Sequence, residues 1–292
     1  MIKALIGIPT YNGAHRVNWL LQSIYMRTGN DIDYKIIICD DSGNKEHQEK
    51  TRSVVDKWSS NLPISLLIND KNMGVAKSWN RIIRSDDSQY AILINDDIIV
   101  IKNWLENIVY FLDNNPDAGA VCYDFIRIDE RDTPFFLNLD INDCYDNMSI
   151  YPIRQMDVIG CLFGFKREMY DMIGGFDENY FTNFEETDFF TNLASRGYPV
   201  YILQCPKILH VYSATFKTSP ELDYRNRFKM SEQYYIKKWN GDKIDTSSRY
   251  MSKIPFQKIK WICDNNIYEK ILTDNYGYFK IKLDDDNIEI VD

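Results

Sequence analysis

The chain has 292 residues, of which 45% are hydrophobic and 26% are charged, and this balance excludes a disordered, collagen-like or coiled-coil protein. Its length suffices for one large domain or two small ones. The 34 Lys and Arg residues against 43 Asp and Glu residues give a formal net charge of −9, which argues against nucleic acid as a partner because non-specific affinity for a duplex needs a basic face.

Four short apolar runs predict strands at residues 4–9, 34–39, 64–68 and 90–94. Apolar residues recur at helical spacing between the first two strands and before the fourth, namely Val17, Leu20, Leu21, Ile24 and Tyr25, then Val75, Trp79, Ile82 and Ile83. Strands that alternate with helices predict an α/β fold with a mostly parallel, Rossmann-like sheet and helices on both faces.

Later elements are less regular. The predicted helices lie at residues 104–114, 166–173 and 184–196, and the predicted strands at 119–128, 198–203 and 207–211. Residues 129–152 are turn-rich and indicate a mobile flap or an edge hairpin. A Gly-rich segment at 160–164 precedes the second of these helices. From Pro220 the pattern is helical as far as Asn240-Gly241, and the last fifty or so residues show no periodicity.

Cysteine usage and the lack of targeting signals predict a cytoplasmic protein. No run of about 18 apolar residues is present, so no transmembrane segment is expected. The N-terminal residues lack the length and the cleavage site of a signal peptide. The six cysteines form no Cys-x-x-Cys pair, and we expect reduced core residues instead of disulfides or a zinc site.

Polar residues follow directly after each of the first four predicted strands. They are Pro9-Thr10-Tyr11-Asn12, Asp40-Asp41-Ser42, Asn69-Asp70 and Asn95-Asp96-Asp97. The preference of Asp, Asn and Ser for turns and helix N-caps explains any one of these clusters. Four in succession, two of them with adjacent acids, instead predict a ligand site at the carboxyl edge of a parallel sheet.

Two common nucleotide-binding motifs are absent. No GxGxxG follows the first strand, and Gly74-Val75-Ala76-Lys77-Ser78 lacks the earlier glycine of a P-loop. Carboxylates at a sheet edge repel a diphosphate unless a divalent cation lies between them. The Asn95-Asp96-Asp97 triplet therefore predicts binding of a phosphorylated ligand through a cation.

Six motifs together resemble family 2 glycosyltransferases of the GT-A fold, over roughly residues 3–215. They are Ile8-Pro9-Thr10-Tyr11-Asn12, Cys39-Asp40-Asp41-Ser42, Asn72-Met73-Gly74 through Asn80, Asn95-Asp96-Asp97, Gly174-Gly175-Phe176-Asp177-Glu178 and Glu185-Glu186-Thr187-Asp188. The resemblance implies transfer of a sugar, with inversion, from a nucleoside diphosphate sugar of the UDP or dTDP type. The acceptor would be a hydroxyl of a carbohydrate or another molecule, in glycan or polysaccharide synthesis. Whether the protein forms a homo-oligomer stays open.

The resemblance also implies a nucleotide-binding set. This set is Pro9, Thr10, Tyr11 and Asn12 in a nucleoside-binding turn, Asp40 and Asp41 at the base, Asn72, Gly74, Lys77 and Asn80 in a stretch that closes over the nucleotide, and Asp96 at the ribose or the sugar.

The triplet Asn95-Asp96-Asp97 matches the DXD motif of the family only in part, because its first acid is replaced by Asn. The resemblance then implies Asp97 as a metal ligand, joined by His210, which follows an apolar strand. An isolated His is otherwise a hydrogen-bonded structural residue. An imidazole ligand favours Mn²⁺, with Mg²⁺ as the alternative.

The family's catalytic base corresponds to Glu186, with Glu185 as the fallback. Glu186 shares a helix face with Phe190 and Leu193 and is expected to point inward, whereas Asp188 is expected to point outward. Burial raises the pKa of a carboxyl group, which suits a general base.

The expected organisation is a GT-A catalytic domain at residues 1–215, with a nucleotide-binding half at 1–100 and an acceptor half at 101–215. An aromatic, helical or irregular C-terminal extension at 216–292 is expected to pack on it. One alternative is a sugar nucleotidyltransferase, which would need a Gly-rich N-terminal loop with Arg and Lys. Another is a non-catalytic glycan-binding protein of the same fold, which the loss of Asp97 or Glu186 would have indicated.

Overall fold

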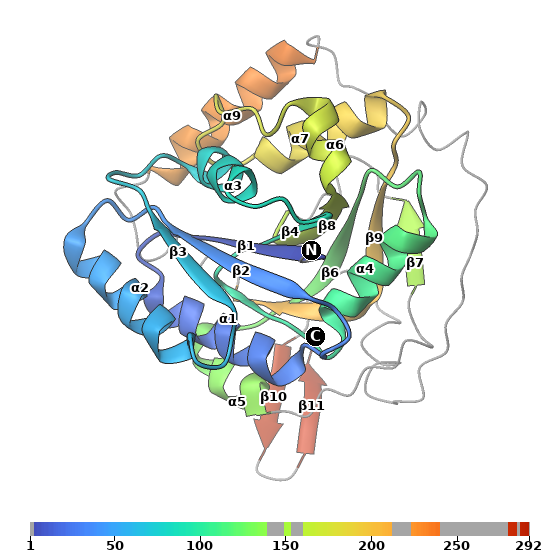
Figure 1. Cartoon of the computed structure of the whole chain (residues 1–292). Coiled ribbons are helices and arrows are strands. Elements are labelled where there is room, and N and C mark those ends of the chain that lie inside the picture. The colour runs from blue at the N-terminus through green and yellow to red at the C-terminus, as the bar shows by residue number, and fades with distance from the viewer. Residues whose placement is uncertain are drawn as a thin grey trace.

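The computed structural model describes residues 3–138, 149–152, 160–211, 223–239, 280–284 and 287–291. Figure 1 shows a twisted central sheet covered by helices. Predictions for residues 212–222 and 240–279, including the break at Asn240-Gly241, lie outside the described residues, as do the side chains of Cys144, Cys205 and Cys263.

The strands are β1 (Ala4–Thr10), β2 (Tyr34–Asp40), β3 (Ile64–Ile68), β4 (Tyr90–Ile94), β5 (Ile98–Ile99), β6 (Ala120–Arg127), β7 (Ser149–Pro152), β8 (Leu162–Lys166), β9 (Val200–His210), β10 (Lys280–Asp284) and β11 (Asn287–Val291). The helices are α1 (Ala14–Arg27), α2 (Lys45–Trp58), α3 (Val75–Arg84), α4 (Trp104–Asn114), the 3₁₀ turn η1 (Glu130–Asp132), α5 (Thr133–Asn138), α6 (Arg167–Ile173), α7 (Glu185–Ser195) and α9 (Tyr224–Lys238).

The main sheet has the strand order β3-β2-β1-β4-β8-β6-β9-β5, and β7 pairs with β9. Strands β3, β2, β1 and β4 are parallel neighbours, as are β6 and β9. Strand β8 runs antiparallel to both β4 and β6 and so joins the two parallel groups. The predicted α/β fold with a mostly parallel sheet flanked by helices is confirmed.

Two layers of apolar side chains, one on each face of the sheet, form the core. Along β4 the side chains alternate, so that Ile92 belongs to one layer and Leu93 to the other. Helices α1, α2 and α4 cover the first face, and α3, α6 and α7 cover the second (Figure 1). Because helices cover both faces of the sheet, the strand sequences are almost continuously apolar.

The structure differs from the predicted elements at several points. Helix α2 was not predicted, because only Thr51 and Val55 are buried in it and its apolar pattern is weak. The two strands predicted at 198–203 and 207–211 are one strand, β9, whose pairing with β6 shifts register between Tyr123 and Phe125.

Three other segments also contain structure that was not predicted. Residues 160–164 lead into strand β8, so the helix predicted from residue 166 begins at Arg167. Residues 129–152 contain η1, α5 and the edge strand β7. The hairpin of β10 and β11 lies in the part of the tail that showed no periodicity.

Candidate active site

The polar clusters after β1, β2 and β3 are joined by backbone hydrogen bonds. The amide of Asp41 donates to the carbonyl of Thr10, and the amide of Asn69 donates to the carbonyl of Asp40, both at 2.8 Å. This arrangement follows from the parallel pairing of β1, β2 and β3, which places their carboxyl ends at one edge. The predicted clustering of these segments is confirmed.

Asp41 holds the turn that leads into α3. Its carboxylate accepts hydrogen bonds from Asn69 Nδ2 at 2.7 Å and from the amides of Met73 and Gly74 at 2.8 Å. Burial raises the pKa of Asp41, and these hydrogen bonds oppose the rise. The structure therefore gives Asp41 a direct part in shaping the 72–74 turn, where the Asn72 side chain also accepts a bond from Gly74 at 3.1 Å.

Gly74 is required by its backbone conformation and its surroundings. Its φ is +88°, in the left-handed region, and a Cβ there would lie 2.5 Å from the carbonyl oxygen of Phe181. The next amide, of Val75, donates to that same carbonyl at 2.9 Å. The turn before α3 thus rests directly on the loop that carries Phe181.

The turn after β1 is tied to the turn after β2. The amide of Asn12 donates to Ser42 Oγ at 3.0 Å, and the amide of Ser42 donates to Asp40 Oδ1 at 2.8 Å. Asp40 is fully buried, whereas Pro9, Tyr11 and Asn12 are partly exposed. The nucleotide-binding residues expected in this region therefore lie together, with Tyr11 and Asn12 among the more accessible of them.

Asp96 lies in a buried polar network. Thr10 Oγ1 donates to its carboxylate at 2.6 Å, and Arg16 Nε donates at 3.2 Å, with both Arg16 and Asp96 almost fully buried. Burial raises the pKa of Asp96, and the Arg16 guanidinium opposes the rise. Sequence reasoning missed Arg16, although an arginine four residues before Leu20 on the apolar face of a helix signals a buried partner.

Asn80 and Lys77 lie further along α3. Asn80 is fully buried; its Nδ2 donates to the Phe176 carbonyl, and its Oδ1 accepts from the Phe176 amide and the Tyr170 hydroxyl, all at 2.9 Å. A buried amide with both ends bonded has no group left for a nucleotide, so Asn80 ties α3 to the loop after α6. Lys77 is partly exposed on the first turn of α3.

Strand pairing brings Asp97 and His210 together. Ile98 of β5 pairs with His210 of β9, and the Val211 amide donates to the Asp97 carbonyl at 2.8 Å. The side-chain atoms Asp97 Oδ1 and His210 Nε2 lie 3.2 Å apart, and both residues are buried. Burial by itself lowers the pKa of His210, but the Asp97 carboxylate and the neighbouring Cys161 raise it to about 10.

The fit of this pair to a divalent cation can be tested on its atoms. A carboxylate oxygen and a neutral imidazole nitrogen suit Mn²⁺, so a bound ion would replace the proton that Asp97 otherwise keeps on His210. The 3.2 Å separation places the two atoms within reach of a common ion. Among the described residues, no group of three or more His, Cys, Asp or Glu side chains is arranged to hold a metal. The pair therefore fits a cation that takes its other ligands from a bound substrate and water.

Glu185 and Glu186 begin helix α7. Glu185 is buried, and Glu186 is partly buried with its side chain against Gly160, where a Cβ would lie 2.3 Å from Glu186 Cγ. Burial raises the pKa of both carboxyl groups, and the charge of Glu186 raises that of Glu185 further. Each carboxyl group therefore binds a proton more readily than an exposed glutamate does.

The expectation that Asp188 points outward is wrong. Its side chain is buried and bonded to Tyr180 Oη at 3.2 Å, Lys238 Nζ at 2.8 Å and Trp239 Nε1 at 2.9 Å. Helix α9 covers this face of α7. Helical periodicity could not reveal this, because the partner Lys238 comes from fifty residues further along the chain.

Residues Gly160 and Cys161 lie between the Glu185–Glu186 pair and the Asp97–His210 pair. Gly160 contacts Glu186, and the next residue, Cys161, lies beside the imidazole of His210. The Cys161 carbonyl also accepts from the Asn95 amide at 2.8 Å, which fixes the segment at the end of β4. The candidate base and the candidate metal ligands therefore lie on either side of one short segment. The sequence marked this segment as Gly-rich but gave it no part in the site.

The fold is similar to that of solved GT-A glycosyltransferases. The mannosyltransferase PcManGT from Pyrobaculum calidifontis, in complex with GDP-Man and Mn²⁺, has a TM-score of 0.59 at 19% identity, covering 82% of this chain and 65% of that chain. TarS residues 1–349 from S. aureus have a TM-score of 0.58 at 14% identity, covering 84% and 68%. The fold is thus the predicted GT-A fold.

The chain belongs to glycosyl transferase family 2, whose model matches residues 5–174. An uncharacterized glycosyltransferase of Haemophilus influenzae is 27% identical over 116 residues, 40% of this chain and 36% of that protein. The glucosyl-dolichyl phosphate glucuronosyltransferase of Haloferax volcanii is 24% identical over 165 residues, 54% of this chain and 50% of that protein. The chain spans half or less of the length of these two relatives. Every helix within the described residues is too short or too polar to cross a lipid bilayer.

Proposed function

We propose that the protein transfers a sugar from a nucleoside diphosphate sugar to a hydroxyl group of an acceptor, with inversion at the anomeric carbon. The observation that carries this proposal is the meeting of Asp97 with His210 at the sheet edge, one short segment away from the Glu185 and Glu186 pair. Membership of the family supports the reaction class.

Asp97 and His210 would hold a divalent cation, Mn²⁺ or Mg²⁺. Such a cation, when bound, neutralises charge that builds up on the leaving diphosphate. PcManGT is complexed with Mn²⁺ and a nucleotide sugar, which supports this assignment for the present chain. The two side chains supply few ligands by themselves, so binding of the cation should depend on the nucleotide.

Glu186 would act as the general base. It takes the proton from the acceptor hydroxyl while that oxygen bonds to the anomeric carbon and the bond from this carbon to the diphosphate breaks. A pKa raised by burial makes the ionised carboxylate a stronger proton acceptor than an exposed one. The close contact with Gly160 fixes the side chain on one side.

The turns after β1 and β2 and the 72–74 turn would bind the nucleoside. Tyr11 and Asn12 are accessible, and Asp41 sets the shape of the 72–74 turn. We propose a UDP or dTDP donor. Structures of TarS contain UDP or UDP-GlcNAc, whereas the structure of PcManGT contains GDP-Man. Binding of UDP, TDP and GDP should therefore be compared to identify the nucleobase.

The test is a thermal-shift measurement with UDP, TDP and GDP, each with Mn²⁺ and with EDTA. UDP or TDP with Mn²⁺ should raise the melting temperature, because a ligand that binds only the folded state stabilises it by mass action. Asp97→Asn should remove this shift. Asp70→Asn, at an exposed position on the same sheet edge, should keep it. Equal shifts in EDTA, or an unchanged shift in Asp97→Asn, would contradict the proposed metal site.

A further inference from the structure

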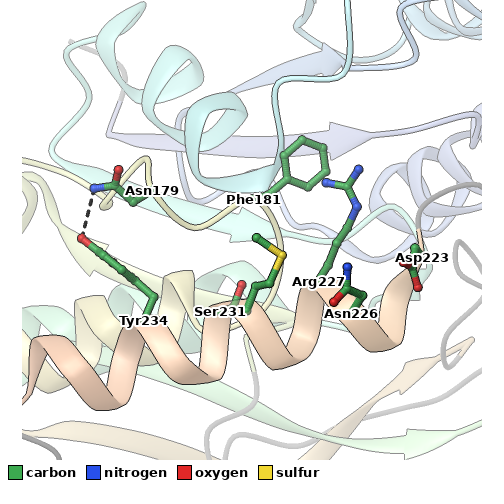
Figure 2. A pocket seen from close by; sticks show the side chains of 8 residues that line it. Asn179, Phe181, Asp223, Asn226, Arg227, Ser231 and Tyr234 are labelled. Atoms are coloured by element: carbon green, nitrogen blue, oxygen red, sulfur yellow. Dashed lines mark hydrogen bonds between the residues drawn. The ribbon is translucent and has the colours of Figure 1, made fainter.

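Helix α9 and the loop before α7 line an open surface pocket with a volume of about 590 Å³, in which apolar surface carries several polar groups. Asn179 and Phe181 line it from the loop. On the other side it is lined by Asp223, which precedes α9, and by five side chains on one face of that helix, at the helical spacing Asn226, Arg227, Met230, Ser231 and Tyr234. Figure 2 shows the side chains of α9 rising toward this loop. The pocket lies outside the candidate active site described above.

The walls of the pocket are held in place by specific contacts. Ser231 Oγ donates to the Thr182 carbonyl at 2.8 Å, and Asn179 Nδ2 donates to the Tyr234 hydroxyl at 3.1 Å (Figure 2). The Arg227 guanidinium carbon lies 3.8 Å from the centre of the Phe181 ring, as expected for a stacked cation–π pair. A binding site with fixed walls loses less entropy when a ligand binds.

The lining matches a neutral sugar better than a charged or a purely apolar ligand. Its formal charges, on Asp223 and Arg227, cancel. Amide, guanidinium, carboxylate and hydroxyl groups can bond to sugar hydroxyls, and Phe181 and Met230 offer apolar surface to the C–H faces of a ring. The volume lies within the range of about 300–1,000 Å³ that is typical of small-molecule pockets and exceeds what one monosaccharide fills.

The pocket adjoins the candidate active site through Phe181. The ring of Phe181 faces the pocket, while its backbone carbonyl accepts from the Val75 amide at 2.9 Å beside Gly74. The same loop leads into α7, which begins with Glu185 and Glu186. A chain of sugars with one end at Glu186 could therefore extend toward α9.

We propose that this pocket binds neutral sugar residues of the acceptor beyond the one that receives the transferred sugar. This inference rests on the proposed function, and it makes the acceptor an oligosaccharide of at least two sugars. Sequence reasoning did not identify the site, because its residues come from a helix face with no apolar pattern and from a loop 40 or so positions earlier.

The test is binding of the whole chain to an array of neutral oligosaccharides of two to five sugars, with the matching monosaccharides. At least one oligosaccharide should bind more tightly than its monosaccharides. Arg227→Ala should weaken this binding tenfold or more, because it removes the stacked guanidinium. Arg225→Ala, at an exposed position two residues away on the same helix, should leave it unchanged. Asn226→Trp, which fills the pocket from an exposed position, provides a second variant.

Two outcomes would overturn the inference: no oligosaccharide binds better than monosaccharides, or folded Arg227→Ala and Asn226→Trp both bind like the wild type. The UDP and Mn²⁺ thermal shift is measured on the same samples. Loss of the nucleotide shift with retained glycan binding would count against the proposed function alone. A normal nucleotide shift without glycan binding would count against the pocket alone.

Discussion

At the scale of single residues, the adjacent acids Glu185 and Glu186 are the most informative feature. Both carboxyl groups have a pKa raised by burial, so ionising both in the folded state is costly. Carboxyl groups with pKa values perturbed in this way are common in active sites, which is why the proposed base is sought in this pair.

Glu186→Gln should separate base catalysis from packing, since an amide keeps the size of the carboxyl group but cannot accept a proton. Sugar transfer should fall by about 10²–10⁴ fold, the usual contribution of a general base. Nucleotide binding should survive, and the melting temperature at neutral pH should stay the same or rise, because a poorly solvated charge is removed. Steady-state transfer rates and thermal melting measure both effects.

Glu185→Gln serves as the control for this assignment. If Glu185→Gln lowers transfer by about 10²–10⁴ fold while Glu186→Gln has little effect, the base is Glu185. Near wild-type transfer by both single variants would rule out a base in this pair.

Arg16 tests the buried network around Asp96. Arg16→Met should lower the free energy of unfolding by about 3–5 kcal/mol, because it leaves the buried Asp96 carboxylate without its cation. Arg52→Met, at an exposed position on α2, should change it by less than about 0.5 kcal/mol. Urea unfolding of both variants measures the difference, and similar values for the two would show that the pair carries no stability.

The sequence predicted the candidate residues better than their surroundings. It placed Asp97 and His210 in one site by resemblance, and strand pairing brings them within 3.2 Å. It missed Arg16 and Cys161 and reversed the exposure of Asp188, because their partners come from distant segments. Lys238 is fifty residues from Asp188, and no local pattern carries that information.

At the scale of elements, side-chain contacts anchor α9 to α7 and to the loop before α7. Lys238 Nζ lies 2.7 Å from Asp177 and 2.8 Å from Asp188, so one cation joins α9 to both the preceding loop and α7. Phe184 packs against Phe228 and Tyr235 of the same helix. Helix α9 thus packs on α7 and on the loop before it. The expected division into a catalytic domain and an extension stays a prediction, since its boundary at residue 215 lies outside the described residues.

Lys238→Met should therefore loosen α9. Because the lysine side chain is partly exposed, solvent screens part of its interaction, and the expected loss is about 1–3 kcal/mol in the free energy of unfolding. Lys237→Met, on the exposed face of the same helix, is the matched control. Limited proteolysis should cleave the Lys238 variant near α9 sooner than the control; equal cleavage rates would count against this anchoring role.

Elements were predicted where their apolar residues form a clear local pattern and missed where they do not. Strands β1 and β4 lie between two helical layers, so their apolar runs are plain in the sequence. Helix α2 buries only Thr51 and Val55, and β8, although buried, is a five-residue segment interrupted by Gly164 that pairs with the distant strands β4 and β6. The antiparallel insertion of β8 depends on long-range pairing, which periodicity does not encode.

At the scale of the whole molecule, the acid pair should make stability depend on pH. The ordinary pKa of a Glu is 4.5, and burial raises that of Glu185 and Glu186 in the folded protein. Between the two values the folded state binds protons that the unfolded state has released, so stability falls as the pH rises through this window.

The melting temperature should accordingly rise when the pH is lowered from about 7.5 to about 5.5. The rise should be smaller in the double variant Glu185→Gln/Glu186→Gln, since amides do not titrate. Repulsion among the surplus of acids acts in the same direction and remains in the variant, so the difference between the two proteins isolates the pair. Identical pH profiles would place the raised pKa values elsewhere.

Phe181 joins two parts of the molecule. Its backbone carbonyl accepts from the Val75 amide beside the 72–74 turn, which is proposed to bind the nucleoside, and its ring stacks against Arg227 in the α9 pocket. If a ligand that binds at the 72–74 turn moves Phe181, the wall of the α9 pocket moves with it, and the reverse also holds. Thermodynamic linkage makes such an effect reciprocal. If a bound nucleotide sugar raises the affinity for an oligosaccharide by some factor, the bound oligosaccharide raises the affinity for the nucleotide sugar by the same factor.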